Sequence, residues 1–591
     1  MSYRNLTPDE INTLQNQGNR SQNWDIVLVA DPFDPLKLTN NVFFGSVRIG
    51  TMTCDSKWDC LPLSVGISGS TLHNVTIGND CVVHNVRMLS GYTIGSNCLL
   101  FNIDEMVYCS NEIVWLEPMN ENGGRKILPF AGMTVGDAYL WARFRGEYKL
   151  MECLEQMTLR ELQCDGGYGV VGDGCLIKNT KCIHNVSIMS SKEDSTSVSE
   201  CIKLGNGVIG YGCRLEYGII AERFLLGEHV HLEYGLRLND SVVGDNSTLA
   251  RCEIGCSIIF PAHEQHHNNS FLIAALIMGQ SNVAAGGTLG SNHNSRTADG
   301  EISCGRGFWP GLCVSVKHSS RFASNCLLAK GDYPSELNIT MPFALVNNNV
   351  AKNRLEVMPA YWWMYNMYAM DRNSRKFATR DKRVYKAQHI EFDNLAPDTV
   401  EEIIIARDLL RIWTEESYRE GKNDIEAHGM EKGGRKTVIL KAGDAYKAYR
   451  DMLVYYAMNT IGDKPDDMQL EPRCTRWVNI GGQLIAEEDM KQMIDDIANG
   501  KLDNWKAIHE RFDQLWAAYP AMKRRHAYQV LCHLSQKNRI DEEDWVSYQM
   551  EYQRIKQFVA DQKKLSRKKD DDNTFRHSTY WNDAEMHAVL N

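Results

Sequence analysis

Aliphatic residues recur every six positions through the first half of the chain, with small and polar residues between them. The phrase IGNDCVV at residues 77–83 returns 17 residues later as IGSNCLL at residues 94–100. Further copies begin at Val171, Ile209, Leu226 and Val243. The last three copies are again 17 residues apart. A period of six matches neither the 3.6-residue period of a helix nor the alternation of a long strand.

This period predicts a triangular coil of short parallel strands. Each flat face holds about six residues, an aliphatic side chain points inward, and a small residue fits the tight corner. Faces of six, six and five residues give the 17-residue repeat. Cysteine occupies the small position in five copies, at Cys81, Cys98, Cys175, Cys213 and Cys326. Packing therefore accounts for these cysteines without any chemistry.

The phrase resembles the hexapeptide repeat of left-handed parallel β-helix proteins, the superfamily of trimeric acyltransferases and of tail domains on sugar-nucleotide enzymes. The resemblance covers residues 42–350 and implies a mainly β fold, a left-handed parallel β-helix. It does not specify a function, because this fold carries several. The whole chain also resembles a gut-bacterial family in which such a helix is joined to an α-helical tail, a resemblance that brings no activity with it.

The pattern divides the chain into parts. Residues 1–41 form a lead segment, and the β-helix of residues 42–350 is interrupted by an insertion with helical texture at about 104–168. Residues 351–591 consist of amphipathic segments with acidic starts and basic ends, which predict an all-α C-terminal domain.

Composition narrows the classes of function. The chain has 591 residues, of which 43% are hydrophobic and 24% charged, which predicts a soluble multidomain protein. No export signal or membrane-spanning apolar run is present, so we expect a cytoplasmic location and no membrane partner. The 18 cysteines are dispersed and are expected to be reduced. A net charge of -11 gives no sign of nucleic-acid binding.

One stretch carries a duplicated polar motif. His-x-Ser-Arg occurs as His293 to Arg296 and again as His318 to Arg321. We predict His293 and His318 as catalytic residues. Arginine forks onto phosphate or carboxylate, and histidine can act as a base. Arg296, Arg321, Arg306 and Lys317 are therefore predicted to bind an anionic small molecule. The alternative is a solvated face of a repeat protein.

The order of features along this stretch adds a second argument. Hexapeptide-class acetyltransferases place a catalytic histidine, a loop, a coil bearing tryptophan and a Lys-Asp-x-Pro exit in that order, and His293, Trp309 and AKGDYP at residues 329–334 are similar. Trp309 is followed by Pro-Gly rather than Ile-Gly, and Gly331 is inserted in the exit. The resemblance implies that His293 deprotonates an acceptor for attack on an acyl thioester, with acyl-CoA as donor and Trp309 among the substrate-binding residues.

Two further clusters are candidates for ligand binding. His263, His266 and His267 are predicted to line a polar pocket beside His293. Their spacing differs from that of the β-helix carbonic anhydrases by one residue, so no metal is predicted, and a plain surface loop is the alternative. Arg125, in the turn NENGGR, is predicted to contribute to a small anion cradle, with a bare surface turn as the alternative.

The leading prediction is a transferase of the acyltransferase type, acting on a sugar-phosphate or nucleotide-sugar acceptor. The alternative is a non-catalytic ligand-binding or assembly scaffold. A homotrimer is expected from the resemblance, because hexapeptide active sites lie between subunits.

Overall fold

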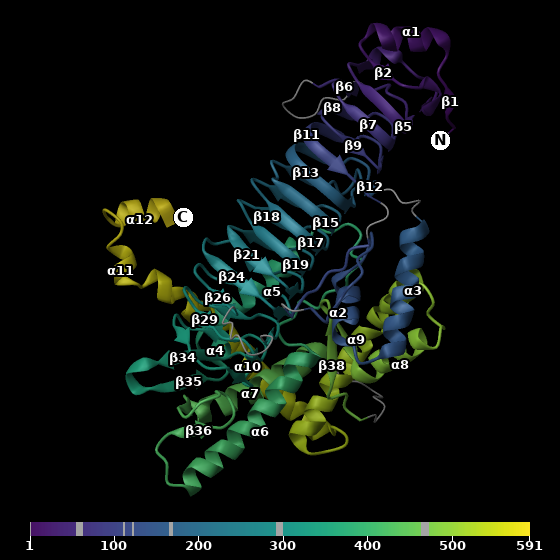
Figure 1. Cartoon of the computed structure of the whole chain (residues 1–591). Helices are drawn as coiled ribbons and strands as arrows, with labels where there is room; N and C mark the ends of the chain where they lie inside the picture. The colour runs from purple at the N-terminus through teal and green to yellow at the C-terminus, as the bar shows by residue number, and fades with distance from the viewer. Residues whose placement is uncertain are drawn as a thin grey trace.

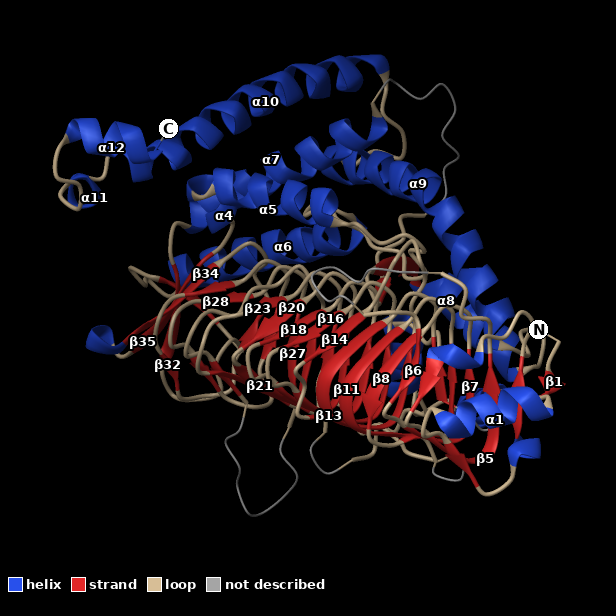
Figure 2. Ribbon diagram, turned by 90° about the horizontal axis from the view of Figure 1, so that it is seen from above, coloured by secondary structure: helices blue, strands red, loops and turns tan. Residues whose placement is uncertain are grey.

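The computed structural model describes residues 2–54, 63–109, 113–120, 123–164, 169–290, 300–462 and 472–590. A long parallel β-solenoid forms the body of the molecule, and helices pack along one side of it and at its C-terminal end (Figure 1). Figure 2 shows α5, α6, α7 and α10 stacked along one side of the coils. The predicted mainly β fold with a helical C-terminal region is confirmed. None of the helices in the described ranges is both long enough and apolar enough to cross a membrane.

Successive coils repeat in strict register. β15 (Lys203–Ile209), β17 (Ile220–Leu226) and β19 (Arg237–Val243) pair in parallel. The corners are residues with positive φ: Gly212, Tyr217, Arg223, His229, Tyr234, Asp240 and Asn246. Their intervals of five, six and six residues make a coil of 17, as the sequence period predicts. Every corner thus falls in the left-handed region, which is unfavourable for residues other than glycine, asparagine and aspartate.

Stacking between coils offsets part of this backbone cost. Tyr217 and Tyr234 occupy the same corner of successive coils, and their ring centroids lie 5.1 Å apart with an interplanar angle of 13°. The guanidinium carbon of Arg251, at that corner of the following coil, lies 4.4 Å from the centroid of the Tyr234 ring. Such contacts are worth about 0.5 to 1.5 kcal/mol each.

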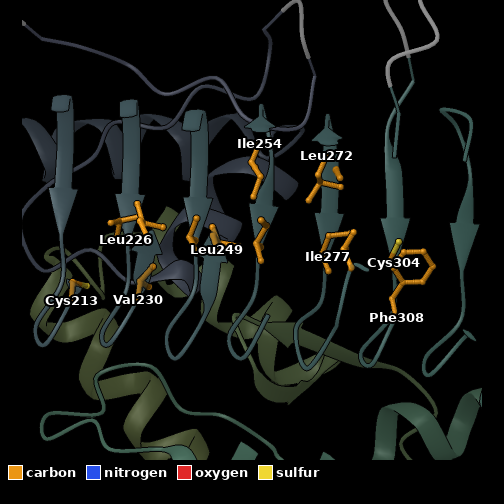
Figure 3. Close-up of a cluster of buried hydrophobic side chains, with 14 of the residues drawn as sticks. Cys213, Leu226, Val230, Leu249, Ile254, Leu272, Ile277, Cys304 and Phe308 are labelled. Atoms are coloured by element: carbon orange, nitrogen blue, oxygen red, sulfur yellow. The ribbon is translucent and has the colours of Figure 1, made fainter. Parts of the chain in front are cut away.

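The interior is a column of aliphatic and cysteine side chains. Figure 3 shows Leu226, Leu249 and Leu272 among the residues that fill it from successive coils. The small-position cysteines are buried. Some of their thiols donate to a carbonyl of the next coil: Cys98 Sγ lies 3.2 Å from Gly172 O, and Cys213 Sγ 3.1 Å from Gly227 O. The predicted packing role of these cysteines is confirmed.

The solenoid begins earlier than residue 42. In the lead segment, β2 (Arg20–Ser21) and β3 (Val27–Val29) pair with β5 (Val42–Ile49), and β4 (Leu38–Thr39) pairs with β6 (Gly66–Ser68). β1 (Arg4–Asn5) pairs antiparallel with β3. The helix α1 (Pro8–Asn16) covers the end of the stack and places Leu14 in the core. The lead segment is therefore the first turn and cap of the solenoid.

The insertion does not interrupt the strand pairing of the solenoid. β11 (Leu99–Val107) continues past residue 104, because Met106 pairs with Ile183 of β13 (Leu176–Ile188). β10 (Tyr92–Ile94) likewise pairs with β12 (Gly169–Val171) beyond the insertion. The inserted chain contains α2 (Val135–Arg143) and α3 (Tyr148–Cys164).

The insertion and the C-terminal region together cover one outer face of the solenoid. An outward column of aliphatic residues in register runs up this face: Val208, Leu225, Val242, Ile258 and Leu276. All are at most 6% exposed, because α2, α3, α8 (Glu487–Ala498) and α9 (Trp505–Ser535) pack over them in one hydrophobic cluster. Burying an aliphatic side chain of this size contributes about 1.5 to 3 kcal/mol. This face is therefore occupied within the chain.

The C-terminal region also extends a sheet of the solenoid. β34 (Leu345–Asn349) pairs antiparallel with β35 (Arg354–Met358), which is followed in the sheet by β37 (Lys436–Ile439) and β36 (Ile425–Ala427). A separate hairpin joins β38 (Trp477–Ile480) and β39 (Gln483–Ala486). The remaining helices are α4 (Tyr361–Tyr365), α5 (Met367–Arg380), α6 (Pro397–Arg419), α7 (Ala442–Ile461), α10 (Glu542–Asp571), α11 (Thr574–His577) and α12 (Asp583–Leu590). The region predicted to be all-α thus includes strands that tie it to the coils.

Replacing Cys98 by arginine tests the corner packing. Cys98 is fully buried, so Cys98→Arg forces a charge into a closed corner and should lower the free energy of unfolding by more than about 3 kcal/mol. Thermal unfolding followed by circular dichroism measures the change. The control is Cys313→Arg, at an exposed corner, which should melt like wild type. Equal melting of both variants would contradict the packing role.

Candidate functional site

One edge of the solenoid holds a continuous segment of the C-terminal region through polar contacts. Polar residues at or next to the corners of several coils face this segment. Glu228 accepts hydrogen bonds from the backbone N–H groups of Lys386 and Ala387, and Gln280 donates to Glu391 O at 2.8 Å. Asp245 forms a buried ion pair with Arg383. We call residues 381–402 the docking segment.

Arg306 is the centre of this contact. Its guanidinium forms two hydrogen bonds with the Asp398 carboxylate, at 2.8 and 2.7 Å, and donates to Asp393 O at 2.9 Å. It also lies 3.2 Å from Gln280 Oε1, and the residue is 2% exposed. Buried charges are stable only when they are paired and hydrogen-bonded, and this one is.

The next coil anchors the first turns of α6. The Ser324 N–H donates to Glu402 Oε2 at 2.9 Å. Burial raises the pKa of Glu402 to about 7, and the negative charge of Asp398 adds to the rise. Glu402 therefore titrates near neutral pH at the contact between solenoid and helix.

A second polar layer lies behind the docking segment. Glu391 accepts from Tyr519 Oη at 2.6 Å and from Lys523 Nζ at 2.7 Å, both on α9. Glu401 accepts from His526 Nε2 at 2.9 Å, and His526 Nδ1 lies 2.9 Å from the Tyr456 hydroxyl. These bonds join α6, α7 and α9 into one unit.

A cavity of about 700 Å³ opens beside this layer. Its walls come from α6, α7, the end of α9 and the residues on either side of them, and its charged lining residues are Arg407, Asp408, Arg411, Arg473, His533 and Lys537. Three of the lining cations pair with carboxylates outside the lining: Lys537 with Asp541 and Asp544, Arg411 with Glu415, and Arg473 with Glu401. The lining is therefore rich in basic side chains, and Asp408 is its one carboxylate among the described residues.

The guanidinium of Arg407 packs against an aromatic ring, but not all of its N–H groups are hydrogen-bonded. Its guanidinium carbon lies 4.3 Å from the centroid of the Tyr446 ring, which fixes its plane. Its Nε is buried and has no hydrogen-bond partner among the described residues. Arg473 Nε lies 2.9 Å from Glu401 Oε1 as an ion pair, without the direction of a hydrogen bond. Both guanidiniums keep hydrogen-bonding capacity for an anion.

The cavity offers binding groups rather than a nucleophile. Burial raises the pKa of the Cys532 thiol in its wall, so this sulfur stays protonated at neutral pH. Burial, with the positive charge of Arg473, lowers the pKa of His533, whose imidazole is neutral at the same pH. The lining residues are thus suited to binding an anion rather than to nucleophilic catalysis.

A family model described as "Domain of unknown function (DUF4954)" matches residues 3–414, more than half of the chain. The chain belongs to the DUF4954 family. An uncharacterized protein of Treponema pallidum (strain Nichols) is 41% identical over 655 residues, covering 100% of this chain and 90% of the relative. The DUF4954 match spans the solenoid, the docking segment and the part of α6 that lines the cavity.

The structure places the described members of the sequence-predicted set of this DUF4954 protein in different environments. His293 and Arg296 lie outside the described residues. His318 is 3% exposed, with Nε2 3.3 Å from Ile273 O, whereas Arg321 is exposed. Lys317 lies 3.8 Å from the Glu336 carboxylate. Within the described residues the duplicated motif thus supplies one enclosed imidazole and one surface cation.

Four predicted ligand-binding residues have structural contacts instead. Arg306 anchors the docking segment, as described above. Arg125 pairs with Glu301 through two hydrogen bonds of 2.6 and 3.0 Å and joins the insertion to a coil, so it forms no anion cradle. Trp309 packs against Trp362, with ring centroids 5.5 Å apart. His263 is fully buried between Ser281 and Gln265, and burial lowers its pKa to about 4.

The three histidines of the cluster differ in burial. His263 is enclosed in a coil, whereas His267 is exposed and stacks obliquely on His266, with ring centroids 4.5 Å apart. In the part of the chain that the structure describes, no three His, Cys, Asp or Glu side chains are grouped to hold a metal ion. His267 therefore lies at the surface and His266 is half-buried beside it, whereas His263 is enclosed in the coil.

Sequence analysis did not identify the cavity residues, although the sequence contains one signal for them. Arg407 and Arg411 are four residues apart in IIIARDLLRIW, which places them on one face of a helix. Nothing in the sequence places Tyr446, Arg473 or His533 beside that face, because they follow in the chain by 35 residues or more.

Glu402 predicts a pH dependence of stability. Its folded pKa of about 7 lies above the ordinary value of 4.5, so the folded state binds the proton more tightly, and stability falls as pH rises between these values. Glu402→Gln keeps the acceptor for Ser324 and cannot ionise. We expect wild type to lose on the order of 1 to 3 kcal/mol relative to the variant between pH 5 and pH 8. Parallel melting curves of both proteins across this range would contradict the assignment.

Proposed function

We propose that this chain binds an anionic metabolite in the cavity between α6, α7 and α9, with the solenoid acting as the scaffold that positions the cavity. One observation carries the proposal. The guanidinium of Arg407 lines a cavity of about 700 Å³ together with Arg411 and Arg473, and its buried Nε has no hydrogen-bond partner among the described residues. An unmade buried hydrogen bond costs about 1 to 3 kcal/mol, so this guanidinium is not fully engaged within the chain.

Acyl transfer is the second proposal. The parallel solenoid fits a hexapeptide-repeat scaffold, and this supports acyl transfer with His293 as the base, acyl-CoA as donor and a sugar-phosphate or nucleotide-sugar acceptor. On this proposal Arg296, Arg321 and Lys317 bind the anionic group. Support for acyl transfer comes from the fold, because the described copy of the duplicated motif has its imidazole, that of His318, enclosed.

A homotrimer also stays a proposal. The outer face carrying Val242 and Ile258 is covered by the insertion and C-terminal helices, so another face of the solenoid would form the interface.

Calorimetric titration with inorganic pyrophosphate tests the first proposal. Wild type should bind, and Arg407→Ala should bind roughly 10- to 100-fold more weakly, because one charge-assisted hydrogen-bonding group is lost. Arg419→Ala removes the same charge from the exposed end of α6 and should bind like wild type. No binding by wild type, or equal binding by Arg407→Ala, would exclude this cavity. Titration with acetyl-CoA of wild type and His293→Ala tests the second proposal in the same way.

A further inference from the structure

A second cavity adjoins the first. It measures about 490 Å³ and is lined by residues 472–477, the start of α8 and part of α9. Pro472, Arg473 and Gln529 line both cavities, so Arg473 stands where they meet. Ligand sites of 300 to 1,000 Å³ hold molecules far larger than a bare phosphate. The paired cavities therefore fit a ligand that has a body besides its anionic group.

The second cavity differs from the first in its charge. Glu487, Glu488 and Asp489, in the first turn of α8, line it together with Arg473, Arg476 and Arg525. Glu487 already interacts with Arg476 at 3.6 Å and with Lys491 at 3.0 Å. Three carboxylates and three guanidiniums thus line the second cavity, whereas four basic side chains and one carboxylate, Asp408, line the first. A second anionic group would meet the carboxylates and be repelled.

The lining of the second cavity suits a neutral group rich in hydroxyls. Ionised carboxylates only accept hydrogen bonds and guanidiniums only donate them, so together they satisfy both capacities of a hydroxyl. The half-buried Trp477 adds an aromatic wall; its indole N–H is used by Cys474 O at 3.1 Å, and Tyr519 and His526 meet its ring edge-on. An aromatic wall packs against the C–H groups of a ring.

We infer that the ligand is a sugar phosphate, with its phosphate against Arg407 and Arg473 and its hydroxyl-bearing ring in the second cavity. This inference rests on the proposed anion-binding function. It assigns the two cavities different tasks: the arginines of the first supply affinity for the phosphate, and the carboxylates of the second select the sugar.

Comparison of probes and variants tests the inference. The full-length chain is titrated with inorganic phosphate, D-glucose, α-D-glucose 1-phosphate, N-acetyl-α-D-glucosamine 1-phosphate and D-fructose 6-phosphate. At least one sugar phosphate should bind tenfold or more tightly than phosphate. Asp489→Asn should remove this gain and leave phosphate affinity unchanged, and Asp495→Asn, on α8 outside the cavity, should change neither.

The outcomes separate the two proposals. If phosphate binds but no sugar phosphate binds more tightly, or if Asp489→Asn keeps the gain, the sugar-phosphate inference is overturned and the anion site stands. If neither phosphate nor any sugar phosphate binds, or if Arg407→Ala leaves their affinities unchanged, the proposed function itself fails. Thermal melting of each variant confirms that the comparison is made on folded protein.

Discussion

The buried polar contacts between the solenoid edge and the docking segment are the constraint on which the rest of the structure depends. Each coil of the solenoid is held in place by its neighbouring coils, because it hydrogen-bonds to the coils above and below. A helical region beside the stack must be placed by other means. Asp245 and Arg306 place it, since each is buried and pairs with a charge in the docking segment. A buried charge that loses its partner costs several kcal/mol, so the segment has one favourable register along the edge.

The position of the candidate site follows from that register. The helix α6 begins at Pro397, and its first turns carry Asp398 and Glu402, which contact the solenoid. Arg407 and Arg411 follow one and two turns later and line the cavity. The hydrophobic cluster over the outer face holds α9 against the same body from the other side. Scaffold and cavity are therefore one mechanical unit.

Much of the fold could be predicted from the sequence, because the repeat is local. The 17-residue period and the buried cysteines follow from residues within one coil. A signal for the covered face was also present: where the helices pack, two aliphatics precede the corner, as in Val242-Val243, whereas the open coils have Thr76-Ile77 and Thr93-Ile94. The outward member of each doublet marks a face that is not exposed to solvent.

The site could not be predicted because its contacts are non-local. Arg306 resembles a ligand-binding arginine in the sequence, but its partner Asp398 is 92 residues away. His263 resembles a pocket residue, but it is fully buried, and Ser281 and Gln265 of the solenoid satisfy its ring nitrogens. Sequence spacing identifies side chains capable of binding, whereas pairing across the fold decides which of them are already engaged.

Hydrogen exchange of Arg306→Ala tests the central claim most directly. If the edge contacts hold α6, backbone amides of residues 397–411 should lose protection by at least tenfold in the variant, while amides of the coils at residues 203–259 keep theirs. Unchanged protection of α6 would contradict the account, because it would show that the helices hold their place without the ionic edge.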